Sequence, residues 1–256
     1  MIVCKSPAEL EKMRAANQLV AQVLEELAAM VAPGVTTADL DAAAEARVRA
    51  AGAEPAFKGY RGYPATLCAS VNEQVVHGIP NRTALASGDI VSLDMGVKLN
   101  GYYGDSAVTV PVGTVDENVR KLLRVTREAL DKGIAQVKVG GRISDIGHAI
   151  QAHVEANGFS VVREFVGHGI GASLHEEPQI ANYGEPGRGP RLAEGMTLAI
   201  EPMVNMGKAA VRVLADGWTA VTRDGSLSAH FEHTVAVTSG DPWILTAREV
   251  PVSARR

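Results

Sequence analysis

The sequence predicts a mixed α/β (α+β) fold in which two similar halves, each a helix pair followed by strands, form one curved, mainly antiparallel sheet with helices outside it. The first observation is an internal repeat, because residues 31–53 align with residues 137–159 at a constant offset of 106. The second is that residues 88–96 resemble residues 195–203 at an offset of 107, with strand-like apolar runs in both. Register sustained over both stretches favours a duplication, whose pseudo-symmetric seam would form a pocket.

Helix signals occur at matching places in the two copies. In each copy a Thr or Ser precedes an Asp at the expected helix start, and a Gly follows the expected helix end. The matching pairs are Gly34 and Gly140, Asp39 and Asp145, Val48 and Val154, and Gly52 and Gly158. The second copy predicts a helix over 143–157, and longer helices are expected before the copies, over about 7–31 and about 116–137. Each half therefore begins with a long helix and a shorter one.

Composition and charge restrict the class of protein. The 256 residues are 46% hydrophobic, enough for a sizeable core, and we expect one domain over 1–256 with halves at about 1–115 and 116–250. A net charge of −4 without a long Lys/Arg run argues against a nucleic-acid footprint. The chain has no apolar run long enough for a membrane span, and its N-terminus lacks a signal-peptide pattern. Cys4 and Cys68 are too few for a disulfide framework, so a reducing cytoplasm is expected.

The segment 93–110 has the pattern of a β-hairpin. Its turn is Asn100-Gly101, a dipeptide that two-residue hairpin turns prefer because both central positions need positive φ. Leu99 then pairs with Tyr102, and this pairing sets the register of the two strands. The register decides which side chains share a face.

Two aspartates come together in this register. Asp94 lies opposite Ala107, and Asp105 is two residues from Ala107 on the same face, so the two backbones are within about 7–8 Å. Carboxylates at that separation reach a pair of metal ions about 3.5–4 Å apart. The alternative is two solvated loop acids, but Asp94 follows an apolar run, where an unpaired buried charge is costly. We therefore interpret both as metal ligands.

Three further side chains complete a candidate metal site. His168 lies between glycines that allow close approach of the backbone to a ligand, and a neutral imidazole binds borderline ions. Glu201 ends an apolar run and Glu232 enters an apolar strand, so each carboxylate needs a partner such as a metal ion. With Asp94 and Asp105, these residues fit two divalent ions that share carboxylates. One His among oxygen ligands indicates manganese, iron or cobalt (Mn²⁺, Fe²⁺ or Co²⁺), with zinc (Zn²⁺) as a further choice, and does not fit a structural zinc site.

Two other histidines are candidates for contact with a substrate. His77 and His175 are not needed as metal ligands, and each could donate a hydrogen bond to a substrate carbonyl or a tetrahedral oxyanion. The alternative for each is an ordinary histidine of a surface loop. His148, His153 and His230 have weaker contexts and receive no role here.

These motifs together resemble the type I methionine aminopeptidases over about residues 5–247. The likeness rests on SVNEQVVHGIP, the eleven-residue spacing of Asp94 and Asp105, GHGIG followed by HEEP, AIEPM, DGWTAVT and SLSAHFEHTV. It implies the pita-bread fold, a pseudo-twofold α/β structure with a dinuclear site at its centre, in agreement with the repeat. The short interval from His168 to Glu201, and the lack of an N-terminal zinc-binding or Pro-rich extension, resemble the minimal bacterial form.

The resemblance implies a role for each candidate ligand. Asp94, Asp105, His168, Glu201 and Glu232 would bind two divalent metal ions, with Asp105 and Glu232 bridging them. The ions would lower the pKa of a bridging water that attacks the peptide carbonyl. Glu201 would also take and relay the proton of that water.

Other residues match the substrate site of the family. His77 would contact the amide beyond the scissile bond, and His175 would stabilise the oxyanion. The positions that line or flank the methionine pocket are Tyr60, Tyr63, Cys68 and Trp218. The departures from commoner residues, which affect only the fine shape of the pocket, are Phe57, Leu174 and His230.

The implied activity is metal-dependent removal of the initiator methionine from nascent proteins, with a small second residue preferred. The implied partners are nascent polypeptide N-termini near the ribosome, without direct contact to nucleic acid or membrane. The enzyme is expected to be a cytoplasmic monomer with a single catalytic domain.

Two rival interpretations follow from the same fold. The first is a proline-specific peptidase such as aminopeptidase P or prolidase, although those usually carry an extra N-terminal domain. The second is a binding protein, similar to pita-bread relatives that serve as histone chaperones or ribosome-associated modules after losing metal ligands. All five ligands are present in this sequence, which argues against the second.

Overall fold

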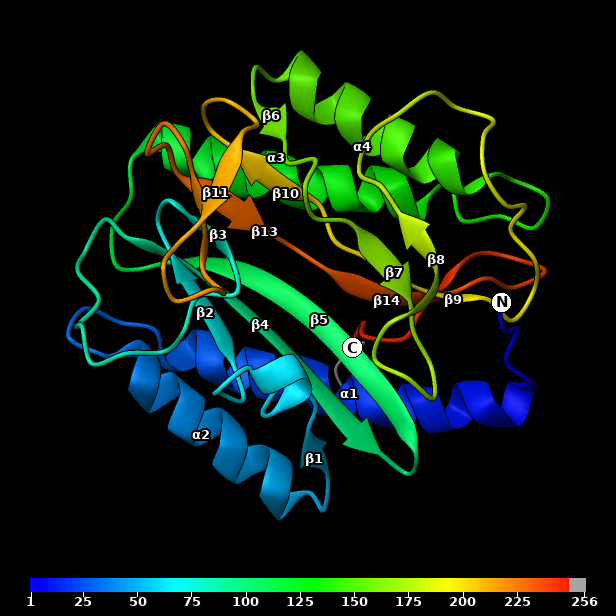
Figure 1. Cartoon of the computed structure of the whole chain (residues 1–256), viewed down its shortest axis with the longest axis horizontal. Helices are drawn as coiled ribbons and strands as arrows, with labels where there is room; N and C mark the ends of the chain where they lie inside the picture. Colours follow the sequence, from blue (N-terminus) through cyan, green and yellow to red (C-terminus); the bar gives the residue numbers. More distant parts are fainter. Residues whose placement is uncertain (249–256) are drawn as a thin grey trace, which may run out of the picture.

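The computed structural model describes residues 1–248, which fold into two pairs of helices around a group of strands (Figure 1). The elements of the first half are α1 (Pro7–Met30), α2 (Thr37–Ala50), β1 (Glu54–Pro55), the 3₁₀ turn η1 (Tyr60–Gly62), β2 (Cys68–Val71), β3 (Gln74–Val76), β4 (Ile90–Leu99) and β5 (Tyr102–Pro111). Those of the second half are α3 (Glu117–Ile134), α4 (Ile143–Ala156), β6 (Ser160–Val161), β7 (Gly167–Gly169), β8 (Glu176–Ile180), β9 (Thr197–Ile200), β10 (Met203–Asn205), β11 (Val211–Val213), β12 (Ala220–Thr222), β13 (Ser228–His230), β14 (His233–Ala236) and β15 (Trp243–Ile244). Within residues 1–248, no helix is long and apolar enough to cross a membrane.

The helices lie outside the strands, as the sequence predicted. In Figure 1, α1 and α2 run along one side, α3 and α4 along the opposite side, and the long β4–β5 hairpin crosses between the pairs. The first helix, α1, packs on β4 and β5, whereas α3 packs on α4, β9, β10 and β13. The strands of both halves are thus held between two helical layers.

The first helix begins where its sequence caps it. Ser6 Oγ accepts the Glu9 N–H at 3.4 Å, and the Glu9 carboxylate accepts the Ser6 N–H at 2.8 Å. Pro7 takes the first helical position, where no N–H is needed. One face of the helix is buried and consists of Met13, Ala16, Asn17, Val20, Val23, Leu24 and Leu27. This face fixes the hairpin against the helix through the hydrophobic effect.

The shorter helices repeat each other closely. Both α2 and α4 contain 14 residues, and their first residues lie at the predicted offset of 106. The glycines before them, Gly34 (φ +93°) and Gly140 (φ +87°), adopt the left-handed conformation that glycine tolerates. Gly34 donates its N–H to the Leu85 carbonyl, and Gly140 donates its N–H to the Leu192 carbonyl. The duplicated helix pairs are therefore confirmed.

The two caps differ in one respect from the sequence prediction. In α2, Thr36 is the N-cap, and the Asp39 carboxylate accepts both its N–H at 3.0 Å and its hydroxyl at 2.6 Å. In α4 the N-cap is Arg142, whose N–H donates to Asp145 at 2.8 Å. Ser144 lies inside the first turn and accepts the Arg188 N–H instead. The expected hydroxyl cap is thus present only in the first copy.

The strands do not form the one continuous sheet that the sequence predicted, although all their pairings within residues 1–248 are antiparallel. They form four sheets, ordered β1-β4-β2 with β5 on β4, β13-β10-β6, β11-β12-β3, and β15-β14-β9-β7-β8. Pro202, which has no N–H to donate, lies between β9 and β10, and Phe231 and Glu232 lie between β13 and β14. A β-bridge, in which the Glu232 N–H donates to the Ala107 carbonyl at 2.9 Å, helps to join the hairpin to this interrupted region.

Two large apolar cores support the strands from opposite sides. One lies between α1, α2 and the hairpin and includes Leu93 and Met95, which are fully buried. The other lies between α3, α4 and the strands of the second half and includes Leu122 and Leu198. Polar groups in the space between the two cores are therefore enclosed by packed structure.

Candidate metal centre

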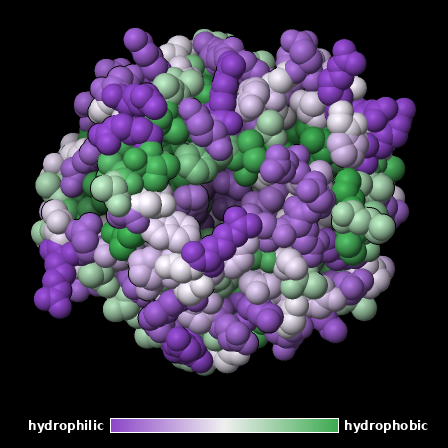
Figure 2. Space-filling model, in the orientation of Figure 1, coloured by the Kyte–Doolittle hydropathy of each residue, from purple (hydrophilic) through white to green (hydrophobic). Residues whose placement is uncertain are grey.

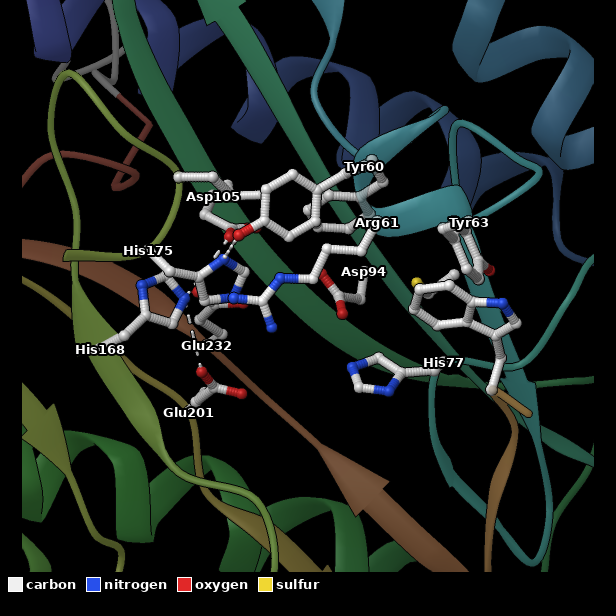
Figure 3. Close-up of a pocket in the computed structure, with 14 residues that line it drawn as sticks. Tyr60, Arg61, Tyr63, His77, Asp94, Asp105, His168, His175, Glu201 and Glu232 are labelled. Atoms are coloured by element: carbon white, nitrogen blue, oxygen red, sulfur yellow. Dashed lines mark hydrogen bonds and ion pairs between the residues drawn. The ribbon is translucent and has the colours of Figure 1, made fainter. Parts of the chain in front are cut away.

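All eleven side chains that the sequence singled out as ligands or substrate contacts line one cavity of about 160 Å³. Figure 2 shows a hollow near the centre of the molecular face, with hydrophilic residues along much of its rim. The complete lining consists of Phe57, Tyr60, Arg61, Tyr63, Cys68, His77, Asp94, Asp105, His168, Leu174, His175, Glu201, Trp218 and Glu232. Figure 3 shows the four acids around a common space, with His168 and His175 on one side and His77 on the other.

The hairpin has the predicted register. Leu99 pairs with Tyr102, and Asp94 pairs with Ala107. Asp105 pairs with Gly96, which is two residues along the strand from Asp94, so the two aspartates share one face of the hairpin. The Asn100-Gly101 turn has φ values of +53° and +84°, as its turn type requires. Both aspartates therefore enter the cavity from one rigid pair of strands.

The second half contributes side chains from places where strands are interrupted. Glu201 lies between β9 and β10, and Glu232 lies between β13 and β14. His168 lies on β7, next to an irregularity in its pairing with β8. At such places the backbone departs from the regular pleat, so a side chain can be directed toward the centre.

The imidazole of His168 faces the acids. Its Nδ1 lies 2.9 Å from the Gly169 carbonyl, so Nδ1 carries a proton and Nε2 is left as an acceptor toward the cavity. Nε2 lies 3.8 Å from Asp105 Oδ2 and 3.7 Å from Glu201 Oε1. One ligand atom each of Asp105, His168 and Glu232 lies within 4.8 Å of the others, which is the size of a metal site.

The electrostatics of the cluster are unfavourable without a cation. Burial raises the pKa of Asp94 to about 7. Burial also raises the pKa of Asp105, Glu201 and Glu232, and the neighbouring carboxylates raise it further. Burial, and then the neighbouring His175, lower the pKa of His168 to about 4, so this imidazole is neutral at pH 7.

Several oxygens of the cluster have no hydrogen-bond partner. Among residues 1–248, Asp94 Oδ1, Asp105 Oδ1 and Glu232 Oε1 are buried and unpaired. Buried carboxylate oxygens are costly unless they are paired or coordinate a metal. The donor set of carboxylates and one neutral imidazole therefore fits divalent metal ions.

The two other histidines border the cluster on opposite sides. His175 Nδ1 lies 2.9 Å from the Tyr60 hydroxyl, and its ring centroid lies 4.2 Å from that of His168. His77 meets the rings of Phe165 and Trp218 edge-on, with centroids 5.4 Å and 6.4 Å away. Burial, followed by the charge of His175, lowers the pKa of His77 to about 4.

An apolar recess adjoins the cluster. Tyr63 and Trp218 meet edge-on with centroids 5.1 Å apart, and the Tyr63 hydroxyl donates to the carbonyls of Leu67 and Gly78. Cys68 is buried and pairs with Asp94 across β2 and β4. The recess therefore has rigid apolar walls that lead directly to an acid of the cluster.

Two residues of this region have positions that were not predicted from the sequence. Arg61 lines the cavity, and its guanidinium lies 5.4 Å from the centroid of the Tyr60 ring. Its φ is +50°, and Gly59 and Gly62 on either side of it in the chain have φ values of +87° and +90°. His230, for which we expected only an effect on the fine shape of the pocket, is buried with Nε2 3.7 Å from Glu201 Oε2. The GYRGY pattern could have indicated Arg61, whereas the approach of His230 to Glu201 depends on the pairing of β10 with β13.

Comparison with known proteins gives the class. A model described as Metallopeptidase family M24 matches residues 11–239. The two helix pairs around a central acidic cluster are the pita-bread architecture, and the chain belongs to metallopeptidase family M24. Membership implies a divalent metal cofactor, which the acidic cluster fits.

Individual relatives agree with this family. The chain is 55% identical to methionine aminopeptidase 1 of Bacillus subtilis (strain 168) over 246 residues, or 96% of this chain and 99% of the relative. A crystal structure of methionine aminopeptidase from Thermotoga maritima is 51% identical, with a TM-score of 0.95 and coverage of 97% and 100%. A prolidase from Pyrococcus furiosus is 22% identical with a TM-score of 0.78, and the match covers 97% of this chain and 66% of the prolidase chain. This likeness shows a shared fold alone.

Proposed function

We propose that this chain is a metal-dependent methionine aminopeptidase that removes the initiator methionine from nascent proteins and prefers a small second residue. The observation that supports this most is the buried group of four carboxylates and one neutral imidazole at the end of an apolar recess. A water bound beside such a cluster lies within reach of a peptide whose first side chain occupies the recess. The relatives at 50% identity or more that bear this name support the substrate.

The ligands in this proposal are Asp94, Asp105, His168, Glu201 and Glu232. They would hold two divalent ions, Mn²⁺, Fe²⁺, Co²⁺ or Zn²⁺, with Asp105 and Glu232 shared by both. When bound, such ions supply a nucleophilic water at neutral pH and polarise the scissile carbonyl.

The proton of the attacking water goes to Glu201. In the proposal this carboxyl holds the proton until the leaving amine takes it. In the metal-free protein, burial and then the charge of Asp94 raise the pKa of this carboxyl. The Nε2 atoms of His168 and His230 lie 3.7 Å from its two oxygens, Oε1 and Oε2, and limit its movement. Glu201 therefore acts as a ligand and as the general base.

The two histidines beside the cluster contact the peptide. His175 Nδ1 lies 2.9 Å from the Tyr60 hydroxyl. In this proposal the hydroxyl donates to Nδ1, so the proton of the neutral ring is on Nε2 and is available to the oxygen of the attacked carbonyl. His77, held between Phe165 and Trp218, contacts the amide beyond the scissile bond. Both roles need only neutral imidazoles, in line with the lowered pKa values of both groups.

The methionine side chain occupies the recess formed by Tyr60, Tyr63, Cys68 and Trp218. Its thioether packs favourably against aromatic edges. The second residue would lie in the cramped space between the cluster and His77, which excludes large side chains. We further propose that the chain acts as a cytoplasmic monomer, as one catalytic domain, on N-termini that emerge from the ribosome.

The experiment that tests this function is an assay of Met-Ala-Ser peptides in chelator, followed by restoration with each metal in turn. We expect no methionine release without metal and recovery with Mn²⁺, Fe²⁺ or Co²⁺. A prolidase would instead cleave Xaa-Pro peptides, and a binding protein would cleave neither. Full activity after metal removal, verified by elemental analysis, would refute the mechanism.

A further inference from the structure

A buried ion pair lies beside the cavity and has no part in the proposed chemistry. Lys5 Nζ lies 2.5 Å from Glu176 Oε2, and the two side chains are only 3% and 14% exposed. The same ammonium donates to the Val3 carbonyl at 3.1 Å, and the Lys5 N–H donates to the Gly195 carbonyl at 2.7 Å. The segment before α1 is thus fixed against the second half of the chain.

Glu176 closes the turn that precedes β8. Its second oxygen, Oε1, accepts the Ser173 N–H at 3.1 Å. Gly171 donates its N–H to the Ser173 carbonyl at 3.1 Å and accepts the Tyr103 N–H at 2.8 Å. A β-carbon on Gly171 would collide with both Lys5 and Glu176, so the ion pair packs directly on the turn.

His175 belongs to this turn and precedes Glu176 in the chain. Its ring is held from the cavity side by the Tyr60 hydroxyl, 2.9 Å from Nδ1, and stacks on the Tyr60 ring at a centroid distance of 5.3 Å. The ring also lies against that of His168, at a centroid distance of 4.2 Å, and the backbone of the turn sets the position from which the side chain extends. The ion pair therefore fixes one end of the same short segment that Tyr60 fixes at the other.

We infer that Lys5 is a positioning residue, which acts through Glu176 to hold His175 in the orientation needed to stabilise the reacting carbonyl. The inference rests on the role proposed above for His175. Without the ammonium, the largely buried Glu176 carboxylate loses its cationic partner and keeps the Ser173 N–H, so the turn must open to hydrate the charge. Opening displaces His175, and small displacements of a catalytic group reduce the rate of the chemical step more than they reduce binding.

The first test is Lys5→Met, which keeps the volume of the side chain and removes its charge. With Met-Ala-Ser peptide and saturating Mn²⁺, we expect kcat to fall about tenfold. We expect KM to stay within about twofold and the metal content to be unchanged. The matched control is Lys121→Met. Lys121 lies on α3, donates to the Asn157 carbonyl at 2.9 Å and does not line the cavity. An unchanged kcat for Lys5→Met would overturn the inference.

A double-mutant cycle separates positioning from general destabilisation. In a His175→Ala background, Lys5→Met should change kcat by less than about twofold, because the group that it positions is already absent. An additional tenfold loss in that background would show that Lys5 acts through some other route and would overturn the inference.

A neutral replacement of the pair provides a variant that is expected to fold. In the double variant Lys5→Met/Glu176→Gln, the side-chain amide oxygen introduced by the second substitution can still accept the Ser173 N–H, while no charge is buried. We expect kcat to recover to within about threefold of the original enzyme. A double variant as slow as Lys5→Met alone would contradict the inference.

A spectroscopic measurement distinguishes failure of this inference from failure of the proposed function. In ¹⁵N-labelled, zinc-loaded protein, the ring resonances of His175, assigned with His175→Ala, should shift in Lys5→Met and stay in place in Lys121→Met. This result does not require peptidase activity. If His175 does not shift, the inference fails even though methionine is released; if methionine is never released, the proposed function fails whatever the spectrum shows.

Discussion

The backbone N–H of Glu232 donates to the carbonyl of Ala107 at 2.9 Å, and through this bond the last strands of the chain meet the β4–β5 hairpin. The neighbouring Ser106 hydroxyl donates to the Glu232 carbonyl at 2.6 Å, and the Thr234 hydroxyl donates to the Asp105 carbonyl at 2.8 Å. Two carboxylates that are distant in sequence are thereby fixed face to face. The proposed bridging ligands, Asp105 and Glu232, are the two acids that this contact brings together.

The first prediction concerns Asp105. Replacing it with Ala removes a carboxylate shared by both ions, so metal content and peptidase activity should be lost together. Elemental analysis and the Met-Ala-Ser assay on one preparation check this. A variant with two ions per chain and no activity would show that Asp105 serves the chemistry and does not hold metal.

The second prediction concerns His175. The His175→Ala variant should keep its metal and lose turnover by roughly 10²–10³-fold, because it lacks the donor to the developing oxyanion. Steady-state kinetics with elemental analysis check this. Normal turnover would exclude the proposed role.

The third prediction concerns the partner of His175. In Tyr60→Phe the ring stack is kept and only one hydrogen bond is lost, which is worth about 1 kcal/mol, so kcat should fall about fivefold. The measurement is the same kinetic assay. A loss as large as that of His175→Ala would mean that the Tyr60 hydroxyl itself contacts the substrate.

The fourth prediction concerns pH and Asp94 in metal-free protein. Burial raises the pKa of Asp94 from 3.8 to about 7, so the folded state binds more protons than the unfolded state between these values, and its stability falls as pH rises. Asp94→Asn removes this contribution and also the part of the raised pKa of Asp105, Glu201 and Glu232 that the charge of Asp94 causes. The opposing contributions of the buried histidines are common to both proteins. Metal-free Asp94→Asn should therefore melt several degrees above the metal-free original at pH 8.

This difference should close as the pH falls toward 4, and it should reverse when metal is added, because the variant lacks a ligand. Thermal melts at pH 4.5, 6 and 8, with and without Mn²⁺, provide the measurement. A difference independent of pH would indicate that Asp94 is ionised throughout the range.

The fifth prediction concerns substrate selectivity. Peptides that begin Met-Ala, Met-Gly or Met-Ser should be trimmed, whereas those that begin Met-Leu or Met-Lys should not. Norleucine should be accepted as the first residue, because an apolar pocket discriminates such changes by only about 1–3 kcal/mol. Mass spectrometry of the products checks this, and efficient cleavage of Met-Leu would indicate a broader aminopeptidase.

Much of the site was predictable because its signals are local. The Asn100-Gly101 turn sets one pairing, and every later pair follows at steps of one residue, so the position of Asp94 opposite Ala107 could be derived before the structure. The repeat likewise follows from capping residues and glycines, whose conformations depend on their immediate neighbours.

Other features depend on contacts between distant segments. The division into four sheets depends on how β9, β10, β13 and β14 meet around Pro202, which no periodicity reveals. The ion pair of Lys5 and Glu176 joins residues 171 positions apart. His230 approaches Glu201 only because β10 and β13 pair in one register. Such placements arise from packing and not from local sequence preference.

The distribution of the proposed ligands along the chain has a consequence for the time at which metal can be acquired. Asp94 and Asp105 belong to the first half, whereas His168, Glu201 and Glu232 belong to the second. During synthesis, a first half that has already emerged presents two carboxylates on a hairpin and nothing to oppose them. Glu232 emerges last, and the hairpin must then close against it. With the proposed ligand set, the complete site can therefore form only after Glu232 has been synthesised and has met the hairpin.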